Sequence, residues 1–149
     1  MSYKFKGLKF SQFEVGQIYY TARRTITEAD VVNFAGLTGD FNPLHVDEVY
    51  AQETPFKKRI AHGMLGVAIA TGLANQLGIF EGTTIALLSQ TISYKGPVFF
   101  GDTVQLELHV KDTKPSSKGG KGVVTFSCPL KNQRGETIVE GEWVVMMVD

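Results

Sequence analysis

The chain has 149 residues, of which 43% are hydrophobic, and this suits a single domain (1–149) with a core of its own. Fifteen basic and fifteen acidic residues give a formal net charge of zero, which argues against binding nucleic acid or an anionic membrane through bulk charge. One cysteine excludes an intrachain disulfide, and the N-terminus lacks a signal-peptide pattern, so we expect a cytoplasmic protein.

The N-terminal part of the chain predicts a strand followed by a helix. Residues 17–25 contain a cluster of β-branched and aromatic side chains, which is typical of a strand. Thr27 has the character of a helix N-cap because Asp30 follows three residues later as its capping-box partner. Gly39 is placed to end a helix that begins near Glu28.

Two further helices are expected before the pattern changes to strands. The first begins near Asp47 and ends before Pro55. The second spans Gly63 to Leu77 and is apolar nearly all round, with small residues at many positions. Because a helix that is hydrophobic on every side is surrounded by protein, we expect it at the centre of the fold. It is too short to span a membrane.

The C-terminal part of the chain alternates apolar and polar residues. This alternation predicts strands over about 84–94, 103–111, 123–130 and 137–148. We expect these four strands to pair as an antiparallel meander around the long helix. The fold class is therefore α+β.

The segment 38–45, Thr-Gly-Asp-Phe-Asn-Pro-Leu-His, sets a carboxylate and an imidazole five residues apart. Pro43 fixes its own φ and keeps Asn42 out of the helical region, so the chain folds back and Asp40 can approach His45. A carboxylate and a neutral imidazole that share one water form a general acid–base pair. The same residues, taken alone, also fit an ordinary turn in which Asp40 only accepts backbone N–H groups.

Gly63 lies where the long helix begins, in the sequence Arg-Ile-Ala-His-Gly-Met at 59–64. The first N–H groups of a helix have no intrahelical partner and point outward at the positive end of the helix dipole. Such an N–H suits a developing oxyanion, and a glycine lets a ligand carbonyl approach closely. The alternative is that Gly63 serves only the tight packing of the helix.

Together these segments resemble the MaoC-like family of R-specific enoyl-CoA hydratases and dehydratases, which have the hot-dog fold. Ala51 stands at the family's distance after His45, and His-Gly-Met at 62–64 matches the start of the long helix. Ser-Tyr-Lys-Gly-Pro-Val-Phe-Phe-Gly-Asp at 93–102 follows in the same order. The likeness runs from Val15 onward. It implies a curved antiparallel β-sheet wrapped around a long central helix, usually in a homodimer with the acyl-thioester channel near the subunit interface.

The resemblance also implies roles for individual residues. Asp40 and His45 would be the catalytic pair, and the Gly63 amide would hold the thioester oxygen. Family members carry a serine in the long helix where this chain has Thr71, so a supporting role is expected for the Thr71 hydroxyl. The other expected substrate contacts are Asn42, His62, Lys57, Lys58 and Arg59. The three basic residues among them precede the long helix and are expected to meet the phosphates of coenzyme A; the alternative is that this short basic run is only a solvated surface.

The implied reaction is hydration of trans-2-enoyl-CoA to (R)-3-hydroxyacyl-CoA and the reverse dehydration. It needs an activated water at C3, a proton for C2 and stabilisation of charge on the thioester oxygen. The sequence leaves open which of Asp40 and His45 takes the proton, and whether an acyl-carrier protein replaces coenzyme A. No cofactor is expected, since coenzyme A enters as part of the substrate.

Two other functions stay open at this point. A hot-dog acyl-CoA thioesterase would hydrolyse the thioester, and a non-catalytic binding module would hold it without turnover. The Asp-x-Asn-Pro-x-His pattern favours the hydratase over both. His62 with Asp40 and His45 would also satisfy a two-histidine, one-carboxylate metal site, but the family motif already accounts for His62, so no metal is expected.

Three further residues have plain structural interpretations. His109 shares a strand face with polar side chains, which predicts a solvated position. Cys128 alternates in phase with apolar residues, which predicts a buried, unreactive thiol. Trp143, near the last strand, is expected in the core or at an interface.

Overall fold

The computed structural model describes residues 2–149. The helical elements are η1 (Phe10–Gln12), α1 (Glu28–Thr38), α2 (Pro43–Val46), α3 (Glu48–Glu53) and α4 (Gly63–Gln76). The strands are β1 (Ile18–Thr25), β2 (Thr84–Gln90), β3 (Ser93–Tyr94), β4 (Thr103–Pro115), β5 (Lys121–Ser127), β6 (Leu130–Lys131), β7 (Thr137–Glu140) and β8 (Glu142–Val148). The α+β class is confirmed.

The expected start and end of α1 are confirmed. The Thr27 hydroxyl accepts a hydrogen bond from the Asp30 N–H at 3.2 Å, and the Asp30 carboxylate accepts one from the Thr27 N–H at 2.9 Å. Gly39 ends the helix with φ at 77°, a left-handed conformation that glycine adopts without strain. The chain therefore leaves α1 in a fixed direction just before Asp40.

The strands form one antiparallel sheet of eight strands, in the order β2-β8-β5-β4-β6-β7-β3, with β1 paired to β4. The expected meander is confirmed for β4, β5 and β8, which pair in sequence order, but β2 pairs with the last strand β8 rather than with β4 and lies at an edge. The expected strand at 123–130 is also divided, since Pro129 offers no N–H to a ladder. The strand at 137–148 is divided at Gly141, where the backbone passes close to the carbonyl of Thr91.

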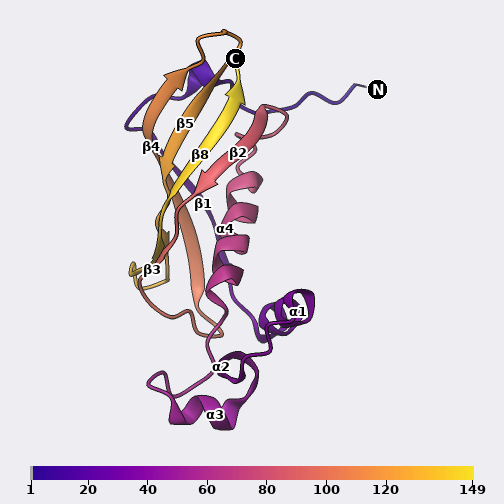
Figure 1. The fold of residues 1–149 in the computed structure, drawn as a ribbon, viewed down its shortest axis with the longest axis vertical. Helices are drawn as coiled ribbons and strands as arrows, with labels where there is room; N and C mark the ends of the chain where they lie inside the picture. Colours follow the sequence, from indigo (N-terminus) through magenta and orange to yellow (C-terminus); the bar gives the residue numbers. More distant parts are fainter. Residues whose placement is uncertain (1) are drawn as a thin grey trace.

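Helix α4 lies along one face of the curved sheet, while α1, α2 and α3 gather beyond one end of it (Figure 1). The buried side of α4 packs with the inward residues of the strands, and this core includes Leu65, Val67, Ile69, Leu73, Leu106, Leu108 and Phe126. This arrangement confirms the expected hot-dog fold. One stripe of α4, formed by Met64, Ala68 and Gly72, stays exposed. We expected protein to surround this helix. Within a single chain, protein covers only one side of it.

The three plain structural interpretations hold. Cys128 and Trp143 are buried in the core, and burial raises the pKa of the Cys128 thiol, which disfavours a reactive thiolate. His109 lies partly exposed on β4, where its Nε2 meets the Glu107 carboxylate at 2.7 Å. Within residues 2–149, every helix is too short or too polar to cross a membrane.

Candidate active site

The turn after α1 is built by local hydrogen bonds. The Asn42 N–H donates to Asp40 Oδ1 at 3.2 Å, and Asn42 Oδ1 accepts from the Leu44 N–H at 3.1 Å as the N-cap of α2. Pro43 is the first residue of that helix, which suits its fixed φ and missing N–H. His45 therefore projects from a helical turn rather than from the loop expected from the sequence. The Asn42 side chain is engaged in capping.

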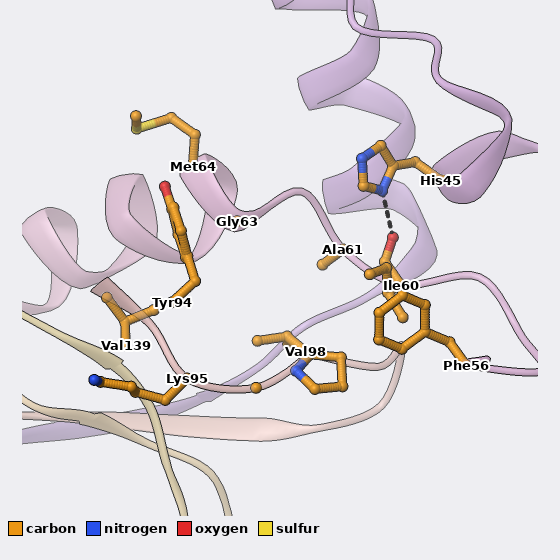
Figure 2. Close-up of a pocket in the computed structure, with 12 residues that line it drawn as sticks. His45, Phe56, Ile60, Ala61, Gly63, Met64, Tyr94, Lys95, Val98 and Val139 are labelled. Carbon is orange, nitrogen blue, oxygen red and sulfur yellow. Dashed lines mark hydrogen bonds between the residues drawn. The ribbon is translucent and has the colours of Figure 1, made fainter. Parts of the chain in front are cut away.

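His45 is oriented by a backbone carbonyl. Its Nδ1 lies 2.7 Å from the Ile60 carbonyl oxygen (Figure 2). Because a carbonyl oxygen only accepts, Nδ1 carries the hydrogen in this bond, and in the neutral ring the lone pair is on Nε2. The ring is partly buried and lines a cavity, so its free nitrogen is the one available to accept a proton.

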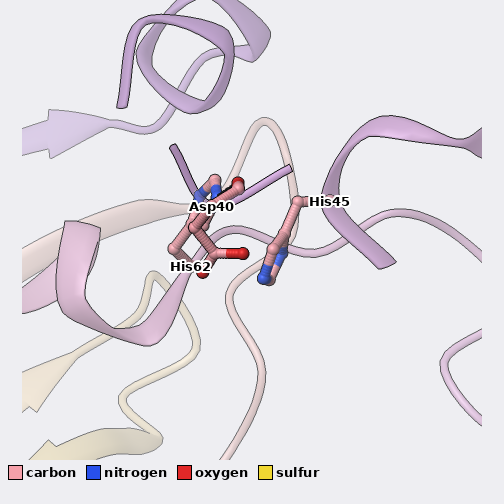
Figure 3. A group of neighbouring side chains, drawn as sticks. All are labelled: Asp40, His45 and His62. Carbon is pink, nitrogen blue, oxygen red and sulfur yellow. Dashed lines mark hydrogen bonds between the residues drawn. The ribbon is translucent and has the colours of Figure 1, made fainter. Parts of the chain in front are cut away.

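Asp40, His45 and His62 meet although 22 residues of chain separate the first from the last. A ligating atom from each lies within 4.8 Å of the others, and Figure 3 shows the Asp40 carboxylate directed toward His45. Asp40 is exposed, His45 is intermediate and His62 is buried. The turn thus brings together the carboxylate and the imidazole that the sequence proposed as a pair.

The two histidine rings stack, with centroids 3.9 Å apart and planes inclined by 30°. Metal-binding lone pairs lie in the ring plane, so two rings that face one another in this way hold their lone pairs in nearly parallel planes. Each ring also has one nitrogen at hydrogen-bonding distance from a backbone carbonyl. A shared ion would have to use the other nitrogen of each ring, His45 Nε2 and His62 Nδ1, or displace these hydrogen bonds.

A cavity of about 540 Å³ lies beside this group. His45 and Gly63 both line it, and its other walls are largely apolar, including Phe56, Val98 and Val139. Gly63 is the first residue of α4, where the helix has no carbonyl to receive its N–H. A proton acceptor and a helix N-terminus therefore face the same space, which has the size of a small-ligand site.

One residue that the sequence did not indicate, Tyr94, lies against Gly63. The Tyr94 ring stands beside it, with its hydroxyl toward Met64 (Figure 2). A Cβ on Gly63 would lie 2.6 Å from Tyr94 Cε1, so the tight approach that requires glycine is made by this ring. Tyr94 is 52% exposed on the edge strand β3. The sequence signal was the segment 93–102, which we used only for the family resemblance.

The other expected substrate contacts are scattered. Thr71 lines a separate cavity of about 130 Å³ between α4 and the β2–β8 strands, and its hydroxyl donates to the Ala68 carbonyl at 2.6 Å. Lys57 and Lys58 are exposed. The Lys58 ammonium lies 4.3 Å from the centre of the Phe99 ring. Both lysines come directly after Phe56 at the wall of the larger cavity.

Arg59 is placed differently from the phosphate contact that we expected. Its guanidinium pairs with Glu28 of α1 at 2.7 Å and with Glu48 of α3 at 2.8 Å, and it lies 4.9 Å from the centre of the Phe100 ring. These contacts bind the two helices to the segment that leads into α4. Arg59 therefore supports the site from outside the cavity.

The chain is similar to one family model and to several known proteins. A family model described as "MaoC like domain" matches residues 10–128. An (R)-specific enoyl-CoA hydratase of Rhodospirillum rubrum is 40% identical, over 93% of this chain and 90% of that protein. An (R)-specific enoyl-CoA hydratase of Aeromonas caviae is 37% identical, over 90% and 95%. The unliganded R-hydratase PhaJ1 of Pseudomonas aeruginosa superposes with a TM-score of 0.80 and 34% identity, over 96% of this chain and 87% of that one.

The contact between Gly63 and Tyr94 predicts a coupled effect on stability. Gly63→Ala introduces a clash that we expect to lower the free energy of unfolding by about 1–3 kcal/mol. Adding Tyr94→Ala removes the obstructing ring, so the double variant should recover part of the loss. Gly72→Ala in the same helix is the matched control, because a Cβ there meets nothing within 4 Å. Thermal unfolding gives the stability of the native protein, Gly63→Ala, the double variant and Gly72→Ala. A Gly63→Ala protein that melts with the native one, or a double variant without recovery, contradicts this account.

Proposed function

Because this chain belongs to the MaoC-like dehydratase family, we propose that it hydrates trans-2-enoyl-CoA to (R)-3-hydroxyacyl-CoA and catalyses the reverse dehydration. The observation that carries the proposal is the proximity of three groups, of which His45 and Gly63 line one cavity and Asp40 lies next to His45. The Asp40 carboxylate lies within 4.8 Å of the His45 imidazole, and His45 and Gly63 line the same space. These groups match the demands of adding water to an enoyl thioester.

In this proposal one water is held between Asp40 and His45. His45 Nε2 takes a proton from the water, because Nδ1 is already occupied by the Ile60 carbonyl. The water oxygen bonds to C3, and the electrons of the C2=C3 double bond move onto the thioester oxygen as an enolate. The enolate then returns its electrons to C2, which takes the proton back from His45 Nε2 on the same face and leaves the imidazole neutral again. Addition is therefore syn, and the exposed Asp40 carboxylate orients the water and supports the positive imidazole.

The Gly63 N–H is assigned to the enolate oxygen. Donors at a helix N-terminus are fixed before the reaction begins, so they stabilise the developing charge without reorganising. The apolar walls of the cavity strengthen this interaction by excluding water. The thioester would lie along the Tyr94 ring that covers Gly63. Asn42 and Arg59 act on the protein side of the site, through the cap of α2 and the ion pairs to α1 and α3.

The substrate is proposed to be a coenzyme A thioester, in keeping with the names of the relatives. An acyl-carrier-protein thioester would present the same reacting atoms. Lys57 and Lys58 are exposed near Phe56 and remain our candidates for phosphate contact. Thr71, at the smaller cavity, remains a candidate for contact with the acyl chain rather than with the thioester. No cofactor takes part in the proposed steps.

A homodimer is proposed as the working assembly. Strand β2 is an edge of the sheet and carries the exposed apolar residues Ile85, Leu87 and Leu88. The stripe of α4 formed by Met64, Ala68 and Gly72 is exposed as well. Unpaired edge strands are templates for further pairing, and a two-fold related copy covers an edge and an apolar face in one step.

The catalytic assignment predicts that Asp40→Asn and His45→Gln fold normally and lose most hydration activity. Each removes a proton-transfer or water-orienting group worth roughly 10²- to 10⁴-fold in rate. The assay follows loss of the conjugated enoyl absorbance of crotonyl-CoA, with a thiol assay run beside it. Released thiol would favour the thioesterase, and binding without either change would favour the non-catalytic module. Near-native turnover by either folded variant would remove that residue from the pair.

Treatment with a chelator should leave the hydration rate unchanged, because every proposed step uses protein groups and water. The measurement compares kcat before and after dialysis against EDTA, with metal content determined on both samples. Activity that disappears with the metal and returns when it is restored would instead support the alternative in which Asp40, His45 and His62 bind an ion.

The proposed dimer, alone or in a higher assembly of dimers, predicts a mass twice that of the chain or a multiple of the dimer mass by light scattering at micromolar concentration. Leu88→Lys on β2 should weaken the dimer, since it buries a charge at the edge. Leu37→Lys is the matched control, because Leu37 is 83% exposed on α1, away from that edge. A stable native monomer with full activity would refute the proposal.

A further inference from the structure

We propose that His62 is a positioning residue that holds Asp40, His45 and Gly63 in register without touching the substrate. This inference rests on the proposed hydratase function, and it changes the role expected for His62 from substrate contact to support. The side chain is 2% exposed and does not line the large cavity. It nevertheless touches or adjoins each of the three groups assigned to the chemistry.

The first link is a hydrogen bond to the turn that carries Asp40. His62 Nε2 lies 2.9 Å from the Asp40 carbonyl oxygen, and because a carbonyl only accepts, Nε2 carries the hydrogen. Asp40 itself is exposed and follows Gly39. The bond therefore ties an exposed turn to a residue fixed in the interior.

The second link is the stack with His45. The Ile60 carbonyl fixes one edge of the His45 ring, and the His62 ring covers one face at a centroid distance of 3.9 Å. Phe34 of α1 packs near His62 with a centroid distance of 5.0 Å, which limits the freedom of the His62 ring in turn. The direction of His45 Nε2 is thus set by a bond in the ring plane and a contact across it.

The third link is the main chain. His62 is the N-cap of α4, and its carbonyl accepts from the Leu65 N–H at 3.1 Å and the Gly66 N–H at 3.4 Å. The residue whose ring holds Asp40 and His45 therefore also sets the first turn of the helix that presents the Gly63 N–H. One residue fixes the spacing between the acid–base pair and the oxyanion donor.

Histidine at position 62 is less favourable for the stability of the fold than an apolar ring would be, and this supports a role beyond packing. Its Nδ1 is buried and has no hydrogen-bond partner among residues 2–149. A buried polar atom without a partner destabilises the folded state, because it has given up its hydrogen bonds to water. Phenylalanine would fill a similar volume and stack on His45 without that cost. The gain that offsets it is the N–H donated to Asp40.

Two variants separate the contacts of the side chain. His62→Phe keeps a ring against His45 and loses the donor to Asp40, whereas His62→Gln keeps an N–H donor and loses the ring. A displacement of about 1 Å in catalytic groups costs roughly 10²-fold, so His62→Phe should lower kcat by about 10- to 100-fold with KM unchanged. Its melting temperature should equal or exceed the native one. His62→Gln should recover part of the lost kcat. His109→Gln, at the partly exposed histidine of β4, is the control and should keep native kcat.

A folded His62→Phe protein with native kcat overturns the inference. It is also overturned if the activity of both variants falls only in proportion to the fraction of protein that is unfolded. Histidine ¹⁵N NMR of the native protein gives a readout that needs no substrate. His62 should carry its proton on Nε2 and His45 on Nδ1. A proton on His62 Nδ1 instead would break the link to Asp40 and refute the positioning role. Absence of any hydration by the native enzyme would count against the proposed function alone.

Discussion

The hydrogen bond between His62 and the Asp40 carbonyl joins two parts of the chain that differ sharply in burial. His62 lies in the interior at the start of α4, while Asp40 belongs to an exposed turn. A turn held only by its own backbone samples many positions, because ordering each residue costs conformational entropy. Attachment to the packed helix supplies the missing restraint. The proposed acid–base pair and the helix N-terminus are then held at a fixed distance from one another.

Two other parts of the molecule help to fix the positions of these groups. The sheet and the buried face of α4 form the core, which fixes the direction of the helix and of its first N–H. The smaller helices lie beyond one end of the sheet (Figure 1), and Arg59 binds α1 and α3 to the segment before α4 through Glu28 and Glu48. Catalytic groups on turns, positioned by a rigid scaffold, are a common arrangement in enzymes.

Local signals in the sequence predicted what local interactions determine. The Thr27–Asp30 capping box, the stop at Gly39 and the extent of α4 all depend on residues close in the chain, and the structure contains them. The family resemblance supplied the hot-dog fold. The place of β2 was missed because alternation defines the faces of a strand but not its neighbours, so the pairing of β2 with β8 has no local signature.

The same limit applies to the candidate site. The Asp40–His45 spacing is local and was readable as an acid–base pair. The Tyr94 ring over Gly63 and the His62 ring against His45 join residues brought together by the tertiary fold. No periodic pattern in the sequence indicates either contact. We expected Arg59 to bind phosphate because nothing near it in the sequence indicates its ion pair with Glu28.

The most direct test of the central claim is the fate of water during turnover. Crotonyl-CoA is incubated with the enzyme in ¹⁸O-labelled D₂O, and the product is analysed by mass spectrometry, NMR and chiral chromatography. Syn addition of one water by the proposed mechanism gives (R)-3-hydroxybutyryl-CoA with ¹⁸O on C3 and deuterium on the syn face of C2. Free coenzyme A and crotonate with ¹⁸O in the carboxylate, or addition to opposite faces, would contradict it.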